Sequence, residues 1–221
     1  MEFSWELVQL LLEGTRDTLI MVFATTALGY VIGLPLGVLL TVSDKNGIAP
    51  RPALYRVLDF LVNILRSIPF LILIILLIPA TRALVGQSYG PRGIIPPLTI
   101  AAFPFIARLV ESSLKEVDHG VIEAAQSMGA GHWHIITRVL LGEARTSLLV
   151  GVTIALGTIF GYTAMAGVVG GGGLGDIAIR YGYYRYEYSV MIVTVVIMVV
   201  LMQIFQAVGN VLSKKLDRRK S

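Results

Sequence analysis

The 221-residue chain contains no cysteine and few charged residues, which make up only 14% of it. Without cysteine it forms no disulfide framework, thiol nucleophile or cysteine-based metal site. Soluble domains carry about 25% charged residues. The low charge, together with 55% hydrophobic residues, therefore indicates an integral membrane protein. The chain also lacks the GxxxxGK[ST] sequence of a P-loop, so we do not expect it to bind ATP as an ATPase does.

Five stretches are long and apolar enough to cross a bilayer, for which about 20 residues are needed. They span residues 18–42, 57–79, 93–112, 146 to about 170, and 188–212. We predict an all-α membrane protein with five transmembrane helices in one domain, residues 18–212. A basic tail follows at residues 213–221.

Residues 1–17 carry three glutamates and lack the basic stretch that opens a signal peptide. Their apolar residues Trp5, Val8 and Leu12 fall on one helical face. This pattern predicts an N-terminal interfacial helix over residues 1–17. A simple extension of the first span is the alternative.

The lysines and arginines are distributed unevenly between the loops. The tail sequence KKLDRRK holds five of them, and the positive-inside rule places it in the cytoplasm. With five spans the N-terminus is then outside, and 11 basic residues fall inside against 5 outside. Because the positive charge collects around apolar spans, we expect contact with membrane lipid and no binding of nucleic acid.

Residues 118–141, between the third and fourth predicted spans, have the composition of two short helices joined at a glycine. Asp118 and Gly120 suit a helix start. We place Glu123 in the first turn, where a carboxylate complements the helix dipole. Gly129 suits the left-handed position that ends a helix.

The second of these helices is expected to be amphipathic, because Trp133, Ile136 and Leu140 are spaced i, i+3, i+7. In the first helix, Ala124 and Ala125 add little bulk, so another surface can approach closely. From the residues alone, the segment is either a loop that folds against its own bundle or a docking surface for another protein.

The order Glu-Ala-Ala, three residues, Gly and an Ile-rich helix resembles the EAA loop of ABC importer permeases. Here it comprises Glu123, Ala124, Ala125, Gly129 and Ile135-Ile136. Four further segments resemble the permeases of bacterial methionine importers, and the similarity covers about residues 15–212. They are RSIPF (66–70), PFIARLVE (104–111), GYTAMAGVVGGGGLG (161–175) and YGYYRY (181–186). The family's usual Leu-Pro is replaced here by Leu141-Gly142.

The resemblance implies a permease subunit of an ATP-driven methionine importer in the bacterial inner membrane. Two copies would form the path, with an ABC ATPase dimer that binds ATP and Mg and an extracytoplasmic methionine-binding protein as partners. Glu123, Ala124, Ala125 and Gly129 would form coupling helices, about residues 118–141, that contact the ATPase. The alternatives are a permease for another amino acid or small osmolyte, an ATP-independent carrier or channel, and a membrane enzyme.

Asp59, Asn63 and Arg66 are the most informative polar residues within a predicted span. Their i, i+4, i+7 spacing places them on one helical face. Charges at membrane depth face the bundle interior or water and have partners. The three residues either line the translocation path or brace a gate, or they form an interhelical contact with Glu111 or a backbone carbonyl.

The fourth predicted span is rich in small residues. Gly157 and Gly161 form a GxxxG pair that permits close helix packing. Tyr162 and Met165 are the bulky residues among them, and we predict that both lie in the translocation path or its gate. Met165 is the candidate gate residue, because methionine is flexible and polarisable. Helix packing alone is the alternative explanation for the small residues.

No catalytic set is predicted, and no metal or cofactor is expected to be bound by this chain. Gly170, Gly172 and Gly175 spell GxGxxG, but dinucleotide binding requires a preceding strand. We expect a flexible outer loop there, and the resemblance implies that it faces the substrate-delivery protein. His132 and His134 do not share a helical face and have no third ligand nearby.

Overall fold

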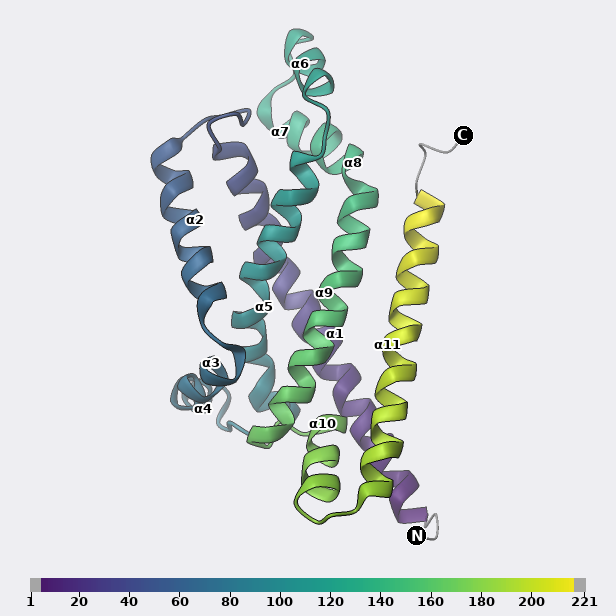
Figure 1. Ribbon diagram of the computed structural model, residues 1–221. Helices are drawn as coiled ribbons and strands as arrows, with labels where there is room; N and C mark the ends of the chain where they lie inside the picture. Colours follow the sequence, from purple (N-terminus) through teal and green to yellow (C-terminus); the bar gives the residue numbers. More distant parts are fainter. Residues whose placement is uncertain (1–4, 217–221) are drawn as a thin grey trace. The chain divides into compact units, whose positions relative to one another are not determined.

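A computed structural model describes residues 5–216, which form helices joined by turns, with no β-strand among them (Figure 1). The chain divides into two compact units. The first unit comprises residues up to 28, 68–102 and 156–206, and the second comprises 29–67, 103–155 and the residues from 207. Four helices contribute residues to both units: α1 (Trp5–Ser43), α5 (Gly90–Lys115), α9 (Arg145–Ala166) and α11 (Tyr188–Leu216).

These four helices are long and apolar enough to cross a membrane, and the bent pair α2 (Pro52–Ser67) and α3 (Phe70–Leu76) supplies a fifth span if counted as one. The prediction of an all-α protein with several spans is confirmed for the described residues. The second span, however, is not one continuous helix over 57–79. Pro69 has an extended backbone, with φ −58° and ψ 131°. Its ring removes a backbone N–H and disfavours helical geometry in the preceding residue.

The predicted N-terminal helix and the first span are one continuous helix, because α1 begins at Trp5. Residues 1–4 lie outside the described part of the chain, and the interfacial position of residues 5–17 stays a prediction. At the other end, α11 continues to Leu216, past the predicted boundary at 212. Residues 217–221 of the predicted basic tail also lie outside the described residues.

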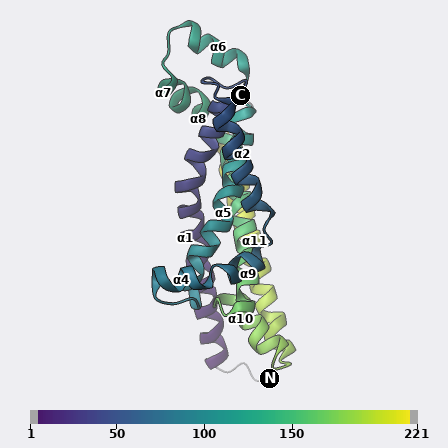
Figure 2. The same cartoon turned by 90° about the vertical axis from the view of Figure 1, so that its left-hand side faces the viewer.

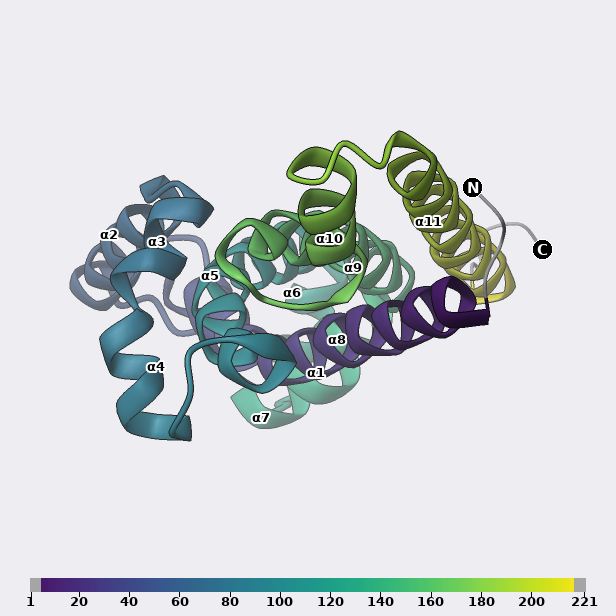
Figure 3. The same ribbon diagram turned by 90° about the horizontal axis from the view of Figure 1, so that it is seen from below.

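The first unit has two apolar clusters. One joins α1, α3, α5 and α9 through its buried members Met21, Phe70, Ile74, Ile94, Leu98 and Ala166. The short helix α4 (Ile78–Val85) follows α3 in the chain. The other joins α1, α10 (Gly173–Ile177) and α11 through Leu11, Ile177 and Val190 (Figure 3). Both clusters draw on apolar side chains that recur at helical spacing.

The glycine-rich segment before and within α10 is packed rather than a flexible loop, so that expectation was wrong. Thr18 Oγ1 accepts a hydrogen bond from the Leu174 N–H at 2.9 Å. Gly173 has φ +75°, and a Cβ there would lie 2.6 Å from Thr18 Oγ1. Glycine at 173 therefore lets α10 approach α1 closely.

The predicted GxxxG contact of α9 is half correct. A Cβ on Gly157 would lie 2.5 Å from Met202 Cε, so this glycine does bring α9 close to α11. A Cβ on Gly161 would meet nothing within 4 Å.

In the second unit, α1 and α5 approach closely at Gly37, where a Cβ would lie 2.6 Å from the Ala107 carbonyl oxygen. Helix α2 lies beside α5 (Figures 1 and 2). Val62 is the buried residue of α2, so apolar packing contributes little to holding this helix against its neighbours.

Candidate functional site

The segment between α5 and α9, residues 118–144, begins with helix α6 (His119–Ser127) and is called the elbow below (Figure 2). The predicted helix start is confirmed, because the Asp118 side chain accepts a hydrogen bond from the Gly120 N–H at 2.7 Å. Glu123 is not in the first turn as predicted, since the helix begins four residues before it. Its carboxylate instead lies 3.1 Å from His119 Nδ1.

Helix α6 ends at the predicted glycine. Gly129 has φ +79°. Its N–H bonds to the Gln126 carbonyl at 2.9 Å, and the Ala130 N–H bonds to the Ala125 carbonyl at 3.0 Å. This pair of bonds satisfies the last carbonyls of the helix and is a Schellman motif.

The second helix of the elbow is assembled from α7 (His132–His134), the π-helix η1 (Ile135–Leu140) and α8 (Leu141–Glu143). The predicted apolar face of Trp133, Ile136 and Leu140 is correct for Leu140, which is buried with Ile135, but wrong for Trp133, which is 77% exposed. Ile135 and Leu140 are five residues apart, as expected where the hydrogen bonds run from i to i+5. Nothing in the structure requires glycine at position 142, where a Cβ would have open space.

The surface of the elbow combines small and large apolar residues. Of the four predicted coupling residues, Ala125 is buried, whereas Glu123, Ala124 and Gly129 are exposed. The structure adds Met128, which is 81% exposed, and Trp133. Exposed apolar groups of this kind mark interaction surfaces. Sequence reasoning missed Met128 and assigned Trp133 to the inner face, although both flank the glycine turn.

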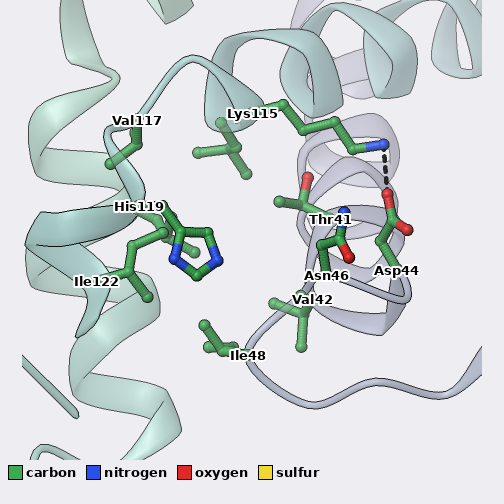
Figure 4. Close-up of a pocket in the computed structure, with 12 residues that line it drawn as sticks. Thr41, Val42, Asp44, Asn46, Ile48, Lys115, Val117, His119 and Ile122 are labelled. Atoms are coloured by element: carbon green, nitrogen blue, oxygen red, sulfur yellow. Dashed lines mark ion pairs between the residues drawn. The ribbon is translucent and has the colours of Figure 1, made fainter. Parts of the chain in front are cut away.

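A cavity of about 420 Å³ lies at the base of the elbow, between the end of α1 and α6 (Figure 4). His119 and Ile122 line one side, and an ion pair between Lys115 and Asp44, 2.7 Å long, lies on the other. The hydrogen bond from the Lys115 ammonium lowers the pKa of the Asp44 carboxyl below its ordinary value. The remaining lining residues are Thr41, Val42, Asn46, Gly47, Ile48, Leu114, Val117 and Leu140.

This ion pair is the outer end of a network that runs along one face of α5. The Lys115 ammonium also donates to Glu111 Oε1 at 2.8 Å, and Arg108 Nη1 donates to Glu111 Oε2 at 2.6 Å. Tyr55 of α2 donates to Glu111 Oε1 at 3.2 Å. The Glu111 side chain is only 5% exposed, so these partners replace the contacts with water that it loses on burial.

Arg108 connects the same network to α2. Its guanidinium forms an ion pair with Asp59 and donates a hydrogen bond to Asn63 Oδ1 at 3.0 Å. Asp59 and Asn63 thus make an interhelical contact, with Arg108 as the partner. Arg66 takes no part: it is exposed and makes no hydrogen bond or ion pair within residues 5–216.

The two predicted gate residues of α9 have different surroundings. Tyr162 stacks on Phe70 with ring centroids 4.4 Å apart and packs against the cluster around Met21. Met165, three residues on, is 53% exposed. In the described part of the chain, no three His, Asp or Glu side chains gather as metal ligands.

The chain matches known membrane proteins over most of its length. A family model described as the binding-protein-dependent transport system inner membrane component matches residues 29–221. The probable D-methionine transport system permease protein MetI of Vibrio cholerae is 51% identical over 210 residues, covering 95% of this chain and 93% of that protein. The D-methionine transport system permease protein MetI of Escherichia coli K12 is 48% identical over 74% of this chain and 76% of its own length.

Solved structures give the same result. A chain of the MetNI methionine ABC transporter in an inward-facing conformation matches with a TM-score of 0.96 and 45% identity, over 98% of this chain and 100% of that chain. A chain of an amino acid ABC transporter, at 19% identity and a TM-score of 0.79, shares the fold over 95% of both chains. With its membrane-spanning helices and its exposed elbow, the chain belongs to the family of binding-protein-dependent transport system inner membrane components.

Proposed function

We propose that the chain is the permease subunit of an ATP-driven importer of methionine in the bacterial cytoplasmic membrane. The observation that carries the proposal is the 51% identity to the Vibrio cholerae permease over 95% of the chain. Two copies form the path across the membrane. ATP and Mg are bound by a separate dimer of ATPase subunits, and an extracytoplasmic methionine-binding protein delivers the substrate.

The elbow is the contact with the ATPase. Glu123, Ala124 and Gly129 provide a small, exposed surface, and Met128 and Trp133 project beside it as apolar anchors. Large apolar side chains of this kind dominate binding energy at protein interfaces. Ala125 is buried and supports this surface by packing on the inner side of α6. In this arrangement the elbow and the C-terminus are cytoplasmic and the N-terminus is outside.

Arg66, Asn63, Tyr162 and Met165 are proposed to line the path or its gate. Arg66 provides the sharpest test, because its side chain is exposed and forms no hydrogen bond or ion pair within the described residues. We expect Arg66→Ala to lower uptake far more than it lowers expression or thermal stability. Normal uptake by a well-expressed variant would remove Arg66 from the path.

Reconstituted uptake tests the function itself. The permease, ATPase and binding protein are placed in vesicles, and uptake of radiolabelled methionine is followed with and without ATP. We expect uptake only with ATP, and methionine outcompeting other amino acids. Preferential uptake of another amino acid would identify a different substrate, and uptake without ATP would indicate a carrier or channel.

Co-purification tests the elbow contact. The variant Met128→Ser with Trp133→Ser should lose the ATPase while remaining folded, because both side chains are exposed. Leu84→Ser is the matched control, since Leu84 of α4 is 78% exposed but lies in the first unit. Retention of the ATPase by the elbow variant would argue against these anchors.

A further inference from the structure

We propose that the network of Asp59, Arg108, Glu111, Lys115 and Asp44 carries displacement of the elbow to helix α2. These are positioning residues: they need not touch the substrate, and they make α2 follow α5 when the ATPase moves the elbow. The inference rests on the proposed function, because it assumes that an ATPase acts on the elbow.

The geometry of α5 provides the first argument. Arg108, Glu111 and Lys115 are spaced i, i+3, i+7, so they form one stripe along the helix that leads into the elbow. Only three residues separate Lys115, the last residue of α5, from the first residue of α6. A displacement of α6 therefore reaches the ion network before any other part of α5.

The weak apolar packing of α2 provides the second argument. Val62 is its buried residue, whereas Val57, Phe60 and Leu61 are each at least half exposed. Leu54, Leu58 and Leu65 are half-buried, so polar contacts supply a large part of the tether to α5. They are Tyr55 to Glu111, and Asp59 and Asn63 to Arg108. Within one copy of the chain, loss of these contacts would free α2 from α5.

The cavity at the base of the elbow provides the third argument. Its space of about 420 Å³ separates α6 from the end of α1 on that side. Side-chain packing there is incomplete, so movement of α6 is not passed directly to the residues across the cavity. One route that remains runs along the chain to Lys115, whose ion pairs with Asp44 and Glu111 distribute the displacement.

The first experiment removes the ion pair between α2 and α5 and then replaces it with a covalent link. In the assembled complex, the variant Asp59→Cys with Arg108→Cys removes the ion pair between α2 and α5 but leaves the Tyr55 hydrogen bond to Glu111 and the pair between Glu111 and Lys115. No native cysteine of this chain competes for reagents, and cysteines of the partner subunits are replaced beforehand. Methionine transported per ATP hydrolysed should fall at least about fivefold, the lower end of ordinary coupling between sites. A short bifunctional methanethiosulfonate linker should restore the ratio, and a reducing agent should abolish the restoration.

The matched control is Arg56→Cys with Glu116→Cys, which changes exposed charges on α2 and just after α5. It should transport as the native complex does, with or without the linker. An unchanged ratio in the Asp59 and Arg108 variant would overturn the proposal. So would a lowered ratio that the linker fails to restore, because the residues would then matter for a reason other than tethering.

The second experiment does not depend on substrate. A nitroxide on Leu61→Cys, an exposed position of α2, reports the distance between the two copies in the complex. ATP should change this distance, and Asp59→Asn with Arg108→Gln, which keeps side-chain size, should abolish the change. Persistence of the change would overturn the inference. Failure of the native complex to take up methionine would instead overturn the proposed substrate, and the distance measurement would still decide the role of the network.

Discussion

Each of the two units is stabilised internally by a different kind of contact. In the first, apolar clusters and closely approaching glycines pack α1, α9, α10 and α11, and its ion pairs, Arg16–Asp17 and Arg180–Asp176, join near neighbours in the sequence. In the second, an ion network joins α2 to α5 across some 50 positions of sequence. The first unit thus relies on apolar packing, whereas the second combines close packing at Gly37 with a network of charges. This difference suits the proposed movement of α2 with the elbow.

The largest effect should come from breaking the charge network. Arg108→Ala leaves Asp59 and Glu111 without their shared partner, and removing one member of a buried ion pair costs about 4 kcal/mol. Arg180→Ala is the control from the first unit. Its side chain is 52% exposed, and exposed pairs contribute less than about 1 kcal/mol. Thermal unfolding of the purified variants in detergent should show a large drop for Arg108→Ala alone, and equal drops would contradict the comparison.

A smaller effect is expected from crowding the first unit. In Gly173→Ala, the added methyl group would press on Thr18 Oγ1 and Met21 Cε, 2.6 and 2.8 Å away, at a residue with φ +75°. Overpacking of this kind costs about 2 kcal/mol. Gly161→Ala should be neutral or slightly stabilising, since its Cβ meets nothing within 4 Å and alanine favours helix. Thermal unfolding in detergent distinguishes the two variants. Unchanged stability of Gly173→Ala would show that α10 shifts away from α1 at little cost.

Local patterns predicted the local structure of this chain well. The start of α6 at Asp118 and its end at Gly129 follow from capping chemistry within a few residues. The break after Ser67 was also visible in principle, because Pro69 restricts its neighbour. The inner face of the second elbow helix was missed because the π-turn between Ile135 and Leu140 changes the period, and apolar spacing alone does not reveal such a turn.

Partners across the fold were harder to predict. The spacing of Asp59 and Asn63 identified one face of α2 but not the arginine that binds it. Spacing identifies a polar face of a helix but not the helix that contacts it, and Arg66 met the same criterion of spacing. The stripe of Arg108, Glu111 and Lys115 on another helix was the available signal. Two charged stripes in an apolar chain need partners, and considering them together would have indicated the network.

The next effect in size tests the elbow. Asp118→Ala removes the side chain that accepts the Gly120 N–H, and loss of such a cap costs about 1 kcal/mol. Asp118→Ser should retain most of it. Because α6 is short and carries the proposed ATPase contact, hydrogen exchange of residues 119–127 should rise in Asp118→Ala while the rest of the chain is unchanged. Global destabilisation would show instead that the elbow is part of one cooperative unit.

The smallest effect concerns the outer end of the network. The hydrogen bond from Lys115 lowers the pKa of Asp44 in the folded chain below its ordinary value of 3.8. A carboxyl with a lowered folded pKa contributes stability above its unfolded pKa, and the contribution is lost as pH falls through the folded value. Native protein should therefore exceed Asp44→Asn in thermal stability by a constant margin from about pH 7 to pH 5. Below pH 3.8 this margin in thermal stability should close. A margin that persists at lower pH would mean that packing of the Asp44 side chain, and not its charge, provides the stabilisation.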